Sequence, residues 1–68
     1  MENLPLGFAF SLSMNKQAMD YYSTLDFDTQ AQITRYIENA TSTKETKNRI
    51  NSSINALSHA DTSFLFFL

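Results

Sequence analysis

Two runs of apolar residues with the spacing of an α-helix constrain the fold of this chain more than any other feature. Steps of three and four residues place each run on one helix face, because an α-helix makes a turn every 3.6 residues. The first run is Ile33, Tyr36, Ile37 and Ala40, and the second is Ile50, Ile54 and Leu57. The sequence therefore predicts an all-α fold, a small three- to four-helix bundle with an apolar C-terminal tail.

Residues with good N-capping side chains precede these runs. Asp26 stands before the first run, Ser42-Thr43-Lys44-Glu45 has the pattern of a capping box before the second, and Asn15 marks a further helix start. We expect helices over about 15–25, 27–40 and 43–58.

The first residues of the chain leave two alternatives. Phe8 and Leu12 lie four residues apart, and Pro5 suits a first helical turn, so a short helix over about 5–13 is indicated. Gly7 and Phe10 weaken this interpretation. An apolar arm laid across the bundle is the alternative.

Composition limits the chain to one small domain over residues 1–68 that is stabilised by packing. It contains no cysteine and a single histidine, so neither a disulfide framework nor a thiolate metal site is available. We expect no metal and no cofactor. Oligomerisation would be a natural supplement to so small a core.

The charge balance argues against a nucleic-acid partner. The net charge is −2, and residues 1–41 alone carry −3, whereas phosphate binding requires a positive surface. No stretch has the roughly 20 apolar residues of a membrane span. The N-terminus has no basic region before its apolar stretch, so no signal peptide is expected and a cytoplasmic location is predicted.

The C-terminal tail is a run of five large apolar residues without a charge. It must be covered, because exposed runs of this kind promote aggregation. It can fold back on its own bundle, pack against a second copy to form a homodimer, or anchor a membrane or peptide partner. The tail residues predicted to make contacts are Phe64, Phe66 and Phe67.

Four basic residues form the one charged cluster with a candidate role. Arg35, Lys44, Lys47 and Arg49 could make a patch for an anion or an acidic partner where two helices meet. The alternative for Arg49 is an ion pair with Glu45, one helical turn earlier.

No group of residues predicts catalysis. His59 is the only imidazole, and we expect it in a flexible link after the last helix, where its nearest carboxylate in sequence is Asp61. Asp26 and Asp28 are close together, but acidic residues are favoured at a helix start for structural reasons. The sequence therefore predicts that the protein is not an enzyme.

Residues 5–57 resemble the helical module of the YdeI/OmpD-associated (bacteriocin-protection) family in a short, stand-alone form. The resemblance implies a bacterial helical module, followed here by a link and tail over residues 58–68. This chain departs from the family pattern in two ways. It has Lys47-Asn48 where the family has more arginine, and the larger upstream domain that the family usually carries is not part of this sequence. The matching positions are Pro5, Phe8, Leu12, Asn15, Ala18, Tyr22, Leu25, Arg35–Ala40, Thr46-Lys47, Arg49-Ile50 and Leu57.

Two functions are consistent with these features. The first is a non-catalytic protein-interaction or oligomerisation module, for which Tyr21, beside the inward-facing Tyr22, is a candidate exposed contact. The alternative, implied by the family resemblance, is a stress or antimicrobial-peptide resistance factor that binds a peptide or an envelope protein.

Overall fold

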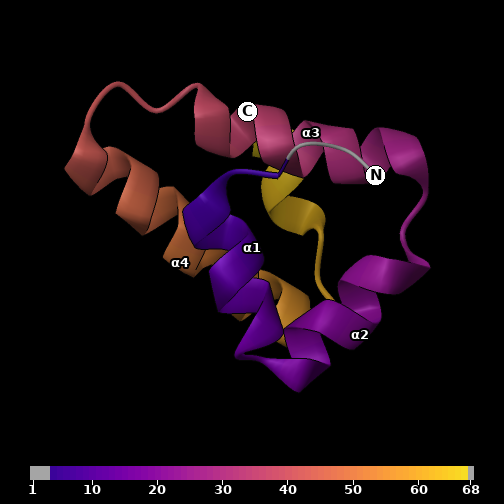
Figure 1. Cartoon of the computed structure of the whole chain (residues 1–68). Helices are drawn as coiled ribbons and strands as arrows, with labels where there is room; N and C mark the ends of the chain where they lie inside the picture. Colours follow the sequence, from indigo (N-terminus) through magenta and orange to yellow (C-terminus); the bar gives the residue numbers. More distant parts are fainter. Residues whose placement is uncertain (1–3, 68) are drawn as a thin grey trace.

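Four α-helices and one short 3-10 helix make up residues 4–67, the part of the chain that the computed structural model describes (Figure 1). No β-strand occurs among these residues, so the predicted all-α fold is confirmed. The first segment is a helix rather than an extended arm. The elements are α1 Leu6–Ser13, α2 Lys16–Thr24, α3 Phe27–Glu38, α4 Thr43–Ser58 and η1 Ser63–Phe67.

Side-chain caps explain why α2, α3 and α4 begin where they do. Asn15, Asp26 and Ser42 each accept a hydrogen bond of 3.0 Å from the backbone N–H three residues later. The predicted capping box of α4 differs in one detail. The Glu45 carboxylate accepts a bond of 3.2 Å from the N–H of Thr41, the residue before the cap, and not from the cap itself.

Helix α4 is the centre of the bundle, since it packs against α1, α2 and α3. The predicted apolar runs supply much of the core, although Ile54, Tyr36 and Ala40 are only half-buried. The ring of Phe8 meets that of Tyr22 edge to face at 5.6 Å, joining α1 to α2. The buried hydrophobic residues are Phe8, Leu12, Ala18, Tyr22, Ile33, Ile37, Ile50 and Leu57.

The single glycine permits a close approach between α1 and α4. A Cβ atom added at Gly7 would lie 3.1 Å from Cδ1 of Ile50, closer than ordinary van der Waals contact. An alanine at position 7 would require the Ile50 side chain to shift by a few tenths of an ångström. Gly7 weakens α1 by its propensity but allows the packing that holds α1 in the bundle.

The end of α4 is a bonded turn, and not the flexible link that the sequence predicts. The N–H of Asp61 donates to the carbonyl of Ala56 at 2.9 Å, and that of Ala60 donates to Leu57 at 3.0 Å. This pair of bonds is a Schellman motif, with Ala60 in the left-handed position at φ 54°. A carboxylate oxygen of Asp61 then accepts a bond of 2.8 Å from the N–H of Ser63 and starts η1.

The apolar tail docks partly on its own bundle. Phe64 and Leu65 are half-buried against the core, and the Phe64 ring lies 5.7 Å from that of Tyr36. Phe66 points away and is 84% exposed. The predictions for the Phe67 side chain and for Leu68 fall outside the described part of the chain. Folding back is therefore confirmed for Phe64 and Leu65 but not for Phe66.

Candidate functional site

Arg49, one of the four predicted basic contacts, forms internal bonds between α3 and α4. Its Nη2 lies 2.9 Å from Oε1 of Glu45, so the predicted ion pair is confirmed. Its Nη1 donates to the carbonyl oxygen of Tyr36 at 2.7 Å, and its guanidinium lies 4.9 Å from the centre of the Tyr36 ring. The Tyr36 carbonyl belongs to the last turn of α3, where carbonyls lack partners within the helix. Arg49 therefore ties the end of α3 to α4.

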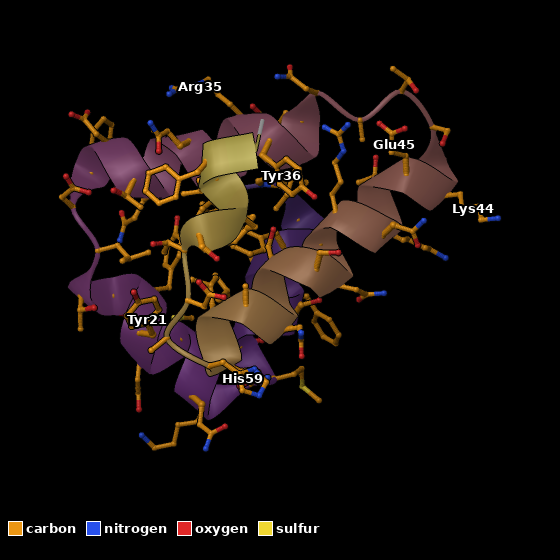
Figure 2. All side chains as sticks on the ribbon, turned by 180° about the vertical axis from the view of Figure 1, so that it is seen from behind. Tyr21, Arg35, Tyr36, Lys44, Glu45 and His59 are labelled. Carbon is orange, nitrogen blue, oxygen red and sulfur yellow. The ribbon has the colours of Figure 1, made fainter. Side chains whose placement is uncertain are left out.

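Two of the other basic residues, Arg35 and Lys44, are not brought together. Arg35, Lys44 and Lys47 are exposed. Figure 2 shows Arg35 and Lys44 well separated, with Tyr36 and Glu45 between them. Arg35 and Lys44 therefore do not share one anion site, and a role for the exposed Lys47 stays a prediction.

Arg49 and Phe64, two of the predicted contact residues, instead both contact Tyr36, which the sequence predicted only as part of an apolar helix face. The Tyr36 ring has the Arg49 guanidinium 4.9 Å from its centre and also packs edge to face with the Phe64 ring. This group holds η1 against α3 and α4 and serves the fold. Tyr21, expected to be an exposed contact, is half-buried against the core on α2, so that prediction of its exposure is wrong.

His59 and the acidic residues are occupied in ending and starting helices. His59 is the C-cap of α4, and its Nδ1 lies 2.8 Å from the carbonyl oxygen of Asn55. Hydrogen bonds from the Ser63 backbone and side chain lower the pKa of Asp61. Hydrogen bonds from the Thr29 side chain and backbone lower the pKa of Asp26 in the same way. Each group has a local structural partner.

No group of three or more His, Asp or Glu side chains suited to a metal ion occurs among residues 4–67. In the same part of the chain, no helix is long and apolar enough to cross a membrane.

The most prominent exposed feature is an apolar row on α1. Leu6 is 86% exposed, Phe10 65% and Met14 73%. They are spaced by four residues, and Met14, the C-cap, keeps helical backbone angles, so the three side chains follow one line along the helix. We call these three residues the α1 ridge. Phe27 and Phe66 are the other large apolar side chains with high exposure.

The α1 ridge was not predicted from the sequence, although the absence of charged residues from this helix was a signal for an apolar outer face. Leu6–Ser13 contains no charged or amide residue, so it is apolar on both sides and its periodicity does not identify the inner face. Phe8–Leu12 and Leu6–Phe10 have the same spacing of four. Only the packing against α2 and α4 decides that the first pair is buried.

Comparison with protein-family models, with curated proteins and with solved structures finds no match for this chain. The resemblance to the YdeI/OmpD-associated family stays a prediction.

Proposed function

We propose that this chain is a non-catalytic protein-interaction or oligomerisation module. The observation behind the proposal is the exposure of the α1 ridge, three large apolar side chains in a row on a helix without charge. Contiguous apolar area of this kind is unfavourable in water and is typical of contact surfaces. The cytoplasmic location predicted from the sequence is part of the same proposal.

The use of the polar residues supports this interpretation. Arg49, Asp26, Asp61 and His59 each have a partner in a helix cap or between helices. Their bonds serve local structure. A binding role based on apolar contact requires none of them to react.

Sedimentation equilibrium of the 68-residue chain tests the proposal. Over a range of about 10 µM to 1 mM, the proposal predicts that the average mass rises above the 7.8 kDa of one chain. A mass that stays at one chain throughout this range would overturn self-association as its function.

The alternative is a resistance factor of the kind that the family resemblance implies, binding a cationic peptide or an envelope protein. Its support is the net charge of −3 over residues 1–41, which includes the exposed Asp28 and Glu38 on α3. Titration with an oligolysine peptide in low salt separates the two functions. Saturable binding that weakens in Asp28→Asn and Glu38→Gln favours the alternative, and no binding at all removes it.

A further inference from the structure

We propose that two copies of this chain pack antiparallel through the α1 ridge, with a two-fold axis at Phe10. This inference rests on the proposed function and names its partner, a second copy. It places the contact on α1, and not on the C-terminal tail where the sequence suggested it. The ridge residues are Leu6, Phe10 and Met14.

The ridge lies on the side of α1 that faces away from the bundle. At 100° per residue, Phe10 is roughly opposite the midpoint between Phe8 and Leu12, which are completely buried. The inner face of α1 is therefore already buried by other parts of the same chain. The outer face presents Phe10 at its centre and Leu6 and Met14 one turn to either side.

Small residues border the ridge on both sides. Ser13 lies about 60° to one side of Phe10 around the helix and is exposed, whereas Gly7, about 60° to the other side, lies next to Ile50 of α4. Ser11 and Ala9 follow at about 100° and are half-exposed. A ridge of large side chains beside grooves of small ones is the arrangement that lets two helices interdigitate at close range. The outer face of α1 contains both parts of such a contact.

The spacing of the ridge makes it complementary to itself. Leu6 and Met14 are each four residues from Phe10, so reversing the helix direction exchanges their positions. In an antiparallel pair, Phe10 meets Phe10 of the second copy, and Leu6 meets Met14 of the second copy. A two-fold symmetric contact requires this kind of self-complementary surface.

Charge also favours a second copy at this face. The chain has a net charge of −2, so two copies repel one another over most orientations. Between Glu2 and Lys16 there is no charged residue, and two α1 helices can meet without like charges facing each other. Depletion of charge is typical of the centre of an interface.

The area of the ridge indicates a weak dimer. At roughly 200 Å² for a fully exposed large side chain, the ridge offers about 450 Å² on each copy. Two ridges with their small flanking residues reach the low end of the size range for specific interfaces, near 1,200 Å². We expect a dissociation constant on the order of 100 µM, so the dimer forms at high concentration.

Two of the exposed apolar features, the α1 ridge and Phe66, belong to elements on opposite sides of the molecule, which provides a matched control. In Figure 1, α1 is in front of the bundle, and Figure 2, seen from behind, has η1 in front and α1 at the back. Phe10 on α1 and Phe66 on η1 are both well exposed phenylalanines. Replacing either one therefore removes a similar apolar area without opening the core.

Sedimentation equilibrium of Phe10→Glu and Phe66→Glu tests the location of the contact, with circular dichroism to verify that both fold. Phe10→Glu should weaken association at least tenfold, because two buried glutamates would face each other, and Phe66→Glu should associate like the parent chain. If Phe66→Glu abolishes association and Phe10→Glu does not, the inference is wrong and the proposed function stands. A parent chain that never associates overturns both the inference and self-association as the proposed function.

Single-cysteine variants test the antiparallel register, since the chain has no cysteine of its own. A mixture of Leu6→Cys and Met14→Cys under mild oxidation at high concentration should give mostly the mixed disulfide. Each variant alone should cross-link poorly, and Asn51→Cys on the outer face of α4 serves as the background control. Efficient cross-linking of Leu6→Cys to itself would indicate parallel helices and contradict the inference.

Discussion

At the scale of single residues, Thr34 carries a buried hydroxyl group that has no hydrogen-bond partner. Its Oγ1 has no hydrogen bond, and the residue is buried in α3. Thr34→Val keeps the shape and removes the unsatisfied group, so we expect the free energy of unfolding to rise by about 1 kcal/mol. Urea denaturation measures it. Ser53→Ala is the control and should destabilise, because the buried Ser53 hydroxyl donates to the Arg49 carbonyl at 2.8 Å. A loss of stability in Thr34→Val would mean that its hydroxyl has a partner in solution.

Ala60 is a second residue that lowers stability, because it has a left-handed backbone conformation that disfavours a side chain. Its φ of 54° costs a side-chain-bearing residue energy that glycine does not incur. We expect Ala60→Gly to raise the free energy of unfolding by about 0.5–1 kcal/mol, measured by thermal melting. Ala56→Gly, in the last turn of α4, should have the opposite sign because glycine is unfavourable within a helix. Equal changes in both variants would contradict the Schellman turn.

Two carboxylates that accept hydrogen bonds from the backbone make the free energy of unfolding depend on pH in the acidic range. The hydrogen bonds from Thr29 and Ser63 hold the pKa values of Asp26 and Asp61 below the ordinary value of 3.8. Because the pKa is lower in the folded state, this stabilisation is complete above pH 3.8 and is lost as the pH falls through the lowered values. Melting temperatures from pH 7 to pH 2 should therefore fall mainly below about pH 4. Asp26→Asn retains a cap without titrating, so its decline should be shallower. If the melting temperature of Asp26→Asn falls as steeply as that of the parent chain, Asp26 does not contribute to the acid sensitivity.

At the scale of elements, η1 should stabilise the bundle through its first two apolar residues. Phe64 and Leu65 are half-buried against the core, whereas Phe66 is exposed. Truncation after Thr62 should lower the free energy of unfolding by about 2–3 kcal/mol, since each half-buried side chain contributes about 1–1.5 kcal/mol. Phe66→Ser is the control and should change it by less than about 0.5 kcal/mol. A truncated chain as stable as the full one in urea would show that η1 does not dock.

Local signals were sufficient to predict most of these elements. Asn15, Asp26 and Ser42 define helix starts through bonds to residues three positions later, so the boundaries could be read from the sequence to within one or two residues. The features that could not be predicted depend on contacts distant in sequence. The carbonyl that Arg49 binds is 13 residues away, and the inner face of α1 depends on its neighbours.

At the scale of the whole molecule, the fold is closed within one chain. The radius of gyration is 10.8 Å, close to the roughly 11 Å expected for a folded chain of this length. Phe64 and Leu65 contribute to this closure, so these two residues are half-buried within their own chain. Three of the five exposed large apolar side chains in the described part of the chain lie on α1, a charge-free helix on the opposite side from η1 (Figures 1 and 2). We therefore expect self-association to use α1 while the rest of the fold is unchanged.

Amide chemical shifts of the labelled chain over a dilution series test this claim most directly, because they report on every element at once. We expect concentration-dependent shifts concentrated in residues 6–14, with residues 63–67 unchanged. Shifts concentrated in residues 63–67, or no change from about 10 µM to 1 mM, would contradict it.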